Sequence, residues 1–249
     1  MYITFYKFFI SFTTFEVNVF YMTNFEQLLY QHSPEPFPII KLANSVGDYT
    51  TIDLSATNKE LQQIDITNAV DFERYIRSYL TKKNKKVAYG GYNELRAIYK
   101  RSGHFYTENP KDERNIHLGV DFWCAAGTAV LAVLNGVVHS FKNNTAFGDY
   151  GPTILLEHEL KGVTFYSLYG HLSIQSLQGL TVGKKVKRGE VIGRLGNASV
   201  NGNYAPHLHF QIIKDVEGNF GDYKGVTSLN DKEKDLLNCP DPNLLLKLK

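Results

Sequence analysis

The chain has 249 residues, with 27 Lys and Arg against 25 Asp and Glu, and a formal charge of +2. This near-balance argues against a dedicated nucleic-acid-binding protein, which concentrates a basic surplus on its surface. Hydrophobic residues make up 43% of the chain and charged residues 21%, a composition that can bury a core and that excludes global disorder.

Residues 1–21 form an apolar N-terminal extension that is interrupted by Lys7 and Glu16. A membrane-spanning helix needs about 20 mostly apolar residues, which this interrupted segment does not provide. The segment also lacks the small-residue cleavage site of a secretory signal peptide. An extension upstream of a start at Met22, a weak export signal or anchor, and a first strand stay open as interpretations. Compartment and membrane association therefore stay open as well.

Residues 22–103 are expected to be a helix-rich N-terminal region. A short helix is predicted near residues 24–31, and Thr67 or Asn68 is predicted to cap a longer one. In the longer helix, apolar residues recur every three or four positions: Val70, Phe72, Tyr75, Ile76, Tyr79 and Leu80. The lysines at 82–86 follow this helix, and we interpret them as its solvated end rather than as a nucleic-acid site.

From about residue 104 the pattern changes to short strands separated by glycine turns. Two hairpins are predicted, one with strands at 128–134 and 137–141 around Asn135-Gly136, the other with strands at 153–160 and 163–169 around Lys161-Gly162. Such a pattern over residues 104–215 is typical of an antiparallel, sandwich-like or barrel-like domain. Residues 216–249 are expected to form a C-terminal tail with one helix near 231–237. The predicted class is α+β, a mainly antiparallel β domain with an N-terminal helical appendage.

Three short segments of the β region carry histidine: IHLGVD at 116–121, which also holds a carboxylate, LYGHLS at 168–173, and APHLHF at 205–210, which holds two histidines. Residues two or four apart in a strand face the same side, so His117 can face Asp121, and His207 can face His209. Imidazole and carboxylate groups bind Zn²⁺, and three protein ligands leave a fourth position for water. Histidines beyond those three can move protons beside that water. The three segments together, rather than any one alone, predict a metal site.

The stretch from about residue 114 to 215 resembles the lysostaphin-type (LytM-like) zinc metallopeptidases, which are peptidoglycan endopeptidases of bacteria. The resemblance rests on the three segments in this order and on the turn-rich run GKKVKRGEVIGRLGN that precedes the last one. It implies that His117, Asp121 and His209 bind one zinc ion per chain.

The same resemblance implies that His171 and His207 are catalytic, and which of them is the general base stays open. It also implies that the substrates are stem or cross-bridge peptides of peptidoglycan, and hence a location in the bacterial cell envelope. Five aromatic residues are candidate walls of a substrate groove: Phe122, Trp123, Tyr150, Tyr169 and Tyr204.

The alternative is a non-catalytic module of the same fold that recruits or activates another cell-wall hydrolase. Such modules generally lose metal ligands, whereas the five implied positions are all present here. In some relatives an upstream segment covers the metal, and residues 92–94 are a candidate for such a segment, against a plainer interpretation as a helix start. The oligomeric state and the role of the first 100 residues stay open.

Overall fold

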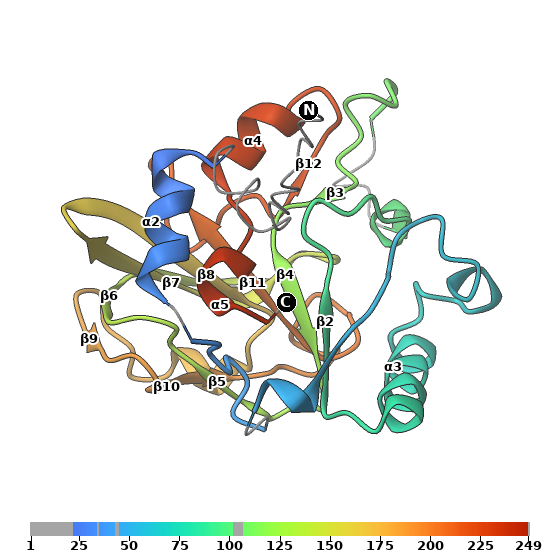
Figure 1. The fold of residues 1–249 in the computed structure, drawn as a ribbon. Coiled ribbons are helices and arrows are strands. Elements are labelled where there is room, and N and C mark those ends of the chain that lie inside the picture. The colour runs from blue at the N-terminus through green and yellow to red at the C-terminus, as the bar shows by residue number, and fades with distance from the viewer. Residues whose placement is uncertain (1–21, 34, 43–44, 102–106, 249) are drawn as a thin grey trace, which may run out of the picture.

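The computed structural model describes residues 22–33, 35–42, 45–101 and 107–248. The apolar extension 1–21 lies outside these residues. A large, mainly antiparallel sheet runs through the molecule, with helices α2 and α5 over one face and α3 beside the β2 end (Figure 1). Within the described ranges, no helix combines the length and apolar character that crossing a membrane requires.

The described part of the N-terminal region contains the α-helices α2 (Asn24–His32) and α3 (Ala69–Lys83). The side chain of Asn68 caps α3 as predicted, because it accepts hydrogen bonds from the backbone N–H groups of Val70 and Asp71. Phe72 and Ile76 of the predicted apolar stripe are buried, but Val70 is 65% exposed. The stripe that packs against the rest of the protein is therefore narrower than its sequence pattern indicates.

The same region also adds two strands to the main sheet, β1 (Tyr49–Thr51) and β2 (Val87–Gly90). It further contains three short 3-10 helices, η1 (Val46–Asp48), η2 (Leu61–Gln63) and η3 (Ile98–Arg101). Strand β1 pairs in parallel with β2, and β2 pairs antiparallel with β4 (Val120–Trp123). The sheet thus continues across residue 103, and the domain boundary predicted there stays a prediction.

The main sheet has the strand order β1-β2-β4-β11-β8-β7-β6-β9. Its other strands are β6 (Gly136–Asn144), β7 (Gly151–Leu160), β8 (Val163–Gly170), β9 (Lys185–Val186) and β11 (His207–Ile213). Two strand pairs lie outside it, β5 (Ala129–Leu131) with β10 (Val191–Arg194) and β3 (Ile116–His117) with β12 (Val226–Thr227). The remaining helices are η4 (Ile174–Leu177), α4 (Lys232–Asn238) and α5 (Asn243–Leu246). This arrangement confirms the predicted α+β class.

One predicted hairpin is confirmed and the other is wrong. Lys161 and Gly162 join β7 to β8 with φ of 50° and 79°, the positive values that a tight two-residue hairpin turn requires. Asn135-Gly136 does not join a hairpin, because β5 pairs with β10 while β6 pairs with β7 and β9. The Asn135 side chain instead accepts a hydrogen bond from the backbone N–H of Arg188 at 2.8 Å. Pairing with distant strands therefore overrides the local turn preference.

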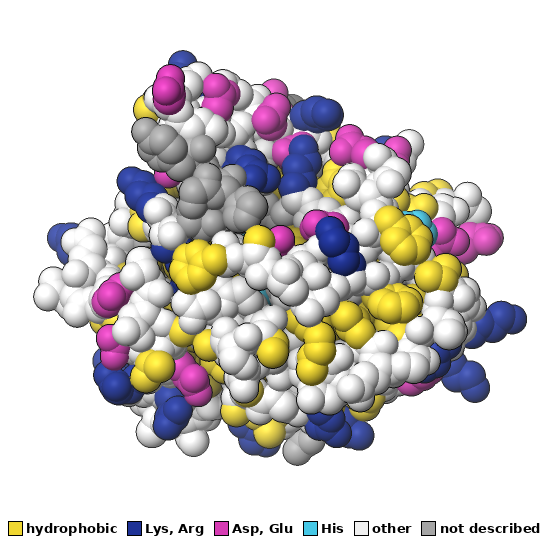
Figure 2. Space-filling model, turned by 180° about the vertical axis from the view of Figure 1, so that it is seen from behind, with side chains coloured by type: hydrophobic (Ala, Val, Ile, Leu, Met, Phe, Trp, Pro, Cys, Tyr) yellow, Lys and Arg dark blue, Asp and Glu magenta, His cyan; other side chains and the backbone are white. Residues whose placement is uncertain are grey.

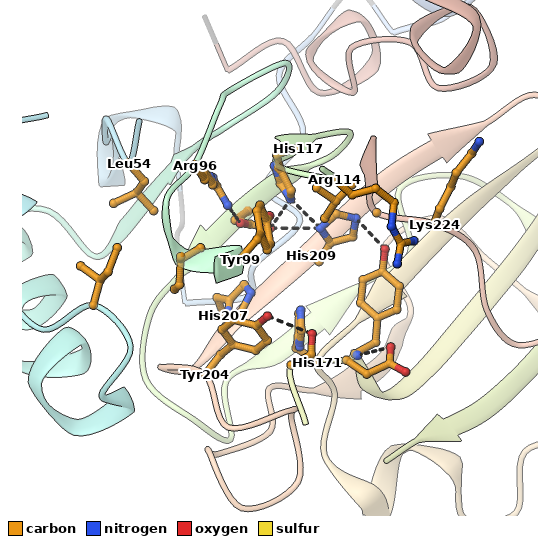
Figure 3. A pocket seen from close by; sticks show the side chains of 18 of the residues that line it. Leu54, Arg96, Tyr99, Arg114, His117, His171, Tyr204, His207, His209 and Lys224 are labelled. Atoms are coloured by element: carbon orange, nitrogen blue, oxygen red, sulfur yellow. Dashed lines mark hydrogen bonds and ion pairs between the residues drawn. The ribbon is translucent and has the colours of Figure 1, made fainter. Parts of the chain in front are cut away.

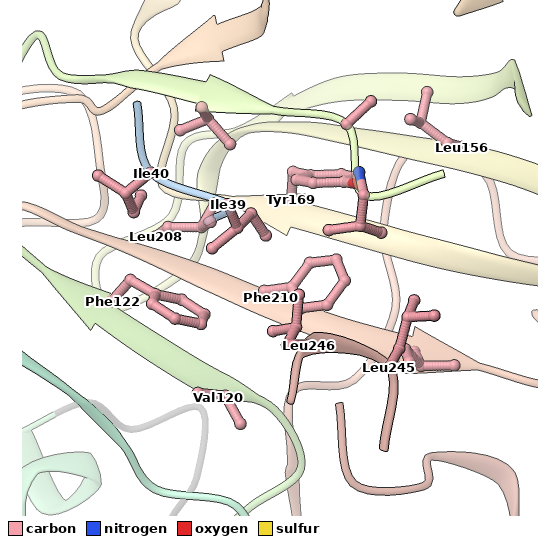
Figure 4. Packing of buried hydrophobic residues seen from close by; sticks show 14 of the residues in the cluster. Ile39, Ile40, Val120, Phe122, Leu156, Tyr169, Leu208, Phe210, Leu245 and Leu246 are labelled. Atoms are coloured by element: carbon pink, nitrogen blue, oxygen red, sulfur yellow. The ribbon is translucent and has the colours of Figure 1, made fainter. Parts of the chain in front are cut away.

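Alternation along the central strands separates a core face from a polar face. In β4, Val120 and Phe122 belong to the main hydrophobic core, and in β11 so do Leu208 and Phe210. Leu245 of α5 and its neighbour Leu246 cover this face (Figure 4). The residues between them, Asp121 and Trp123 in β4 and His207, His209 and Gln211 in β11, consequently point to the opposite face. The candidate site is built on that polar face.

The outer surface carries no single dominant charge on the side shown in Figure 2. Hydrophobic side chains gather across the middle of this face, and acidic and basic side chains are interspersed mainly toward its edges.

Candidate metal centre

The antiparallel register of β4 and β11 places His209 directly opposite Asp121. His117, four residues earlier on β3, completes a compact group. Nε2 of His117 lies 2.8 Å from Nδ1 of His209, and each of these nitrogens lies 3.2 Å from Oδ1 of Asp121. The three side chains are nearly inaccessible, with exposures of 1%, 3% and 2% for His117, His209 and Asp121. The structure therefore brings together the three expected ligands, of which His117 and His209 are labelled in Figure 3.

The hydrogen bonds around the two imidazoles determine where their protons sit. Nδ1 of His117 donates to the carbonyl oxygen of Gly91 at 3.0 Å, which leaves Nε2 with a lone pair. The Gln211 amide nitrogen donates to the Lys224 carbonyl, so its oxygen faces His209 and accepts from Nε2–H at 2.9 Å. Nδ1 of His209 then also carries a lone pair.

Three lone-pair atoms thus converge with no hydrogen atom between them. Burial lowers the pKa of His117 to about 3, so protonation of this imidazole does not relieve the repulsion at neutral pH. A cation between the three atoms would relieve it. Two imidazoles and one carboxylate, each held by an outer partner, fit Zn²⁺ and leave a coordination position free.

An arginine that sequence reasoning missed holds the carboxylate from its other side. Nη1 of Arg96 donates to Oδ2 of Asp121, and Nε of Arg96 donates to Oε2 of Glu94 at 2.6 Å. Burial by itself would raise the pKa of Asp121, but His117 and then Arg96 outweigh it and hold that pKa well below its usual range. Asp121 is therefore a carboxylate with one oxygen committed to Arg96 and the other available to a metal.

Residues 92–94, the candidate segment for covering the metal site, hold the backbone of a candidate ligand instead. The backbone N–H of Asn93 donates to the carbonyl of His117, and the N–H of His117 donates to the carbonyl of Glu94. The Tyr92 hydroxyl points away and donates to the Cys239 carbonyl at 2.8 Å. Residues 92–94 also start no α-helix, since the next helical turn is η3. This segment pairs with the strand that carries a candidate ligand.

His171 and His207 lie next to each other below His117, Asp121 and His209, which we call the candidate metal-binding group, and their ring centroids are 4.2 Å apart (Figure 3). Nδ1 of His171 donates to the Asn201 carbonyl at 2.9 Å, and Nδ1 of His207 donates to the Ala205 carbonyl at 2.8 Å. Each ring therefore carries its lone pair on Nε2. His171 also has a φ of 62°, a left-handed conformation that costs a non-glycine residue energy and is found preferentially at functional sites.

Both imidazoles are neutral at pH 7. Burial lowers the pKa of His207 to about 4, and burial followed by the neighbouring His207 lowers the pKa of His171 well below its usual value. Two neutral imidazoles beside a metal-binding group can accept a proton from water. Their catalytic assignment stays a prediction.

A cavity of about 370 Å³ is lined by the three candidate ligands and by the two neighbouring histidines. Among the aromatic residues proposed as groove walls, Trp123, Tyr150 and Tyr204 line it. Phe122 and Tyr169 belong to the main core on the other face. The hydroxyl of Tyr150 lies 3.4 Å from Nε2 of His209, which places this residue against the metal-binding group.

Comparison with known proteins finds a family model and several relatives that match this region. Residues 115–221 match the model of peptidase family M23. The DD-carboxypeptidase/endopeptidase Mpg of Neisseria meningitidis is 36% identical over 126 residues, which are 49% of this chain and 26% of that protein. The peptidoglycan DD-endopeptidase ShyA of Vibrio cholerae is 37% identical over 98 residues, or 39% of this chain and 20% of that protein.

Lysostaphin of Staphylococcus staphylolyticus is 39% identical over 97 residues, or 39% of this chain and 18% of that protein. The solved lysostaphin of Staphylococcus simulans aligns with a TM-score of 0.33 and 31% identity, covering 48% of this chain and 44% of that one. The matched part thus spans about a quarter or less of the curated relatives' length. The family match and the three curated relatives confirm the resemblance inferred from the three histidine segments.

Proposed function

We propose, because residues 115–221 match the model of peptidase family M23, that this chain is a zinc-dependent endopeptidase acting on stem or cross-bridge peptides of peptidoglycan. The observation that carries the proposal is the convergence of three lone-pair atoms, from His117, Asp121 and His209, on one point of a cavity that also holds two neutral imidazoles. The substrate class is supported by the relatives, two of which are named for DD-peptidase activity.

His117, Asp121 and His209 would hold the ion. Bound zinc supplies Lewis acidity, which polarises a peptide carbonyl and lowers the pKa of water from about 15.7 toward 7. Nε2 of His171 or of His207 accepts the proton of the attacking water, because both rings are neutral and carry their lone pair there. The ring that takes this proton then carries an N–H at Nε2, with which it can stabilise the developing oxyanion and return the proton to the leaving amine.

The alternative of a non-catalytic module that recruits another hydrolase is not favoured. Such a module would need none of these proton-transfer groups, whereas here both extra imidazoles are buried in the cavity in the tautomer that suits a base. A substrate in peptidoglycan implies action in the bacterial cell envelope.

The proposal is tested by digesting purified peptidoglycan with and without a chelator and by identifying the fragments by mass spectrometry. Two variants separate ligands from bases. His209→Ala should lose zinc and cleavage together, whereas His207→Ala should keep zinc and lose cleavage. His32→Ala, at the exposed end of α2, serves as the control that keeps both. Metal retained in His209→Ala but lost in His207→Ala would reverse the assignment, and chelator-insensitive cleavage would exclude zinc.

A further inference from the structure

The cavity has two chemically different ends. Part of its wall carries charged side chains, among them Arg114 and Lys224. Another part is apolar and comes from one hydrophobic cluster that also includes Trp123, with the lining residues Leu54, Leu61, Ile66, Phe72 and Ile98. Figure 3 shows Leu54 and Lys224 on opposite sides of His117 and His209. We call the apolar end, bounded by these five residues and Trp123, the apolar recess.

The wall of the apolar recess comes mostly from the N-terminal region. Its five aliphatic and aromatic residues lie between positions 54 and 98, before the segment that matches the M23 family. Leu54 is held near the metal centre, because its backbone N–H donates to Oε1 of Glu94, whose other oxygen accepts from Arg96. The recess is thus a feature of this chain and is tied structurally to the metal-binding group.

Trp123 connects the recess to the candidate catalytic residues. Its ring stacks on His207 at 4.0 Å and 15°, and Phe72 packs edge-on against it at 5.1 Å. Its Nε1–H is buried and has no hydrogen-bond partner among the described residues. A buried donor without an acceptor costs free energy, and a backbone carbonyl of a bound peptide is an acceptor that would satisfy it.

We infer that the apolar recess is a substrate subsite that takes an aliphatic side chain adjacent to the cleaved peptide bond, while Trp123 donates a hydrogen bond to the substrate backbone. This inference rests on the proposed function and specifies its substrate. The occupant follows from continuity, because the recess and the metal-binding group are parts of one cavity. A peptide whose carbonyl reaches the metal side places a neighbouring side chain against the apolar wall. Peptides with glycine on both sides of the bond leave this wall unfilled.

The single tryptophan of the chain makes the recess directly observable. Trp123 is the only Trp in the sequence, so intrinsic fluorescence reports on this location alone. The full-length, zinc-loaded His171→Ala variant retains the stack of Trp123 on His207, and we expect it to bind peptide with little turnover. It is titrated with two end-blocked peptides, Gly-Leu-Gly and Gly-Gly-Gly, and the wild type is assayed for cleavage of longer versions of both.

We expect the leucine peptide to shift the Trp123 emission and to bind about 10- to 100-fold more tightly than the glycine peptide, because one aliphatic side chain leaves water. In the wild type the same preference should appear in kcat/KM. Ile98→Phe fills the recess and should abolish the preference. Leu54→Ala enlarges the recess and should weaken leucine-peptide binding, and this variant provides the test if Ile98→Phe folds poorly. Val70→Phe on the exposed surface of α3 is the matched control and should change neither.

The possible failures are distinguishable. Zinc-dependent cleavage with equal binding of both peptides, or a preference that survives in Ile98→Phe and Leu54→Ala, would overturn the subsite and leave the peptidase proposal standing. A leucine-dependent fluorescence shift without cleavage of any peptide or of peptidoglycan would support the recess and refute the proposed function.

Discussion

Arg96 provides the charge that compensates the buried Asp121, and its removal should destabilise the metal-free protein strongly. The two side chains are 3% and 2% exposed. Arg96→Met keeps an apolar stem but leaves the carboxylate without its guanidinium. Removing one partner of a buried ion pair costs about 3–5 kcal/mol. For a chain of this size about 2–4 °C is lost per kcal/mol, so the melting temperature should fall by roughly 6–20 °C.

Zinc should restore part of this loss. An ion bound by His117, Asp121 and His209 places positive charge beside the same carboxylate, so the rise in melting temperature on adding zinc should be larger for Arg96→Met than for the wild type. Calorimetry of the metal-free and zinc-loaded proteins measures both quantities.

Arg77→Met is the matched control, because Arg77 pairs with Glu73 at 3.3 Å on the surface, where the two side chains are 76% and 41% exposed. Pairs of this kind contribute about 0–1 kcal/mol. If the metal-free Arg96 variant were as stable as the Arg77 variant, the reasoning that Arg96 compensates a buried charge would be refuted.

Two further outcomes are expected. Gln211→Leu removes the acceptor that orients His209 and should weaken zinc binding about 10- to 100-fold, measured in competition with a chelator. Gln211→Glu keeps an acceptor oxygen and should bind zinc more nearly like the wild type. Equal zinc affinities of the Leu variant and the wild type would contradict this role of Gln211. Burial lowers the pKa of His158 from 6.5 to about 4, so the neutral ring stabilises the fold above pH 6.5 and this contribution is lost as the pH falls toward 4. At about 1.4 kcal/mol per pKa unit the loss is roughly 3 kcal/mol. Denaturant unfolding at pH 7 and pH 4 should therefore show a smaller loss for His158→Gln than for the exposed control His32→Gln, and equal losses would exclude His158 as the source.

Local patterns in the sequence predict the elements that carry the candidate site. Alternation along residues 207–213 places His207 and His209 on one face of β11 with the core-forming Leu208 and Phe210 on the other. The Lys161-Gly162 turn likewise specifies the hairpin of β7 and β8. These features depend on residues within one strand or one turn, so they can be read without knowledge of the fold.

The turn at Asn135-Gly136 shows where such local information ends. The same dipeptide that favours a hairpin is followed by a strand that pairs with β7 and β9, because burial in the main sheet outweighs the preference of two residues. Similarly, Val70 fits the helical stripe of α3 but lies in the first turn, where it is exposed.

The sequence by itself determined the strand that carries His207 and His209, the hairpin of β7 and β8, and the residue types that suit a zinc peptidase. Tertiary structure alone decided that Arg96 contacts Asp121 across 25 positions of the chain, that Gln211 orients His209, and that residues 54–98 wall the cavity. The physical reason is that strand periodicity acts between near neighbours in the chain, whereas charge compensation and cavity walls depend on groups that become neighbours only when the sheet has formed.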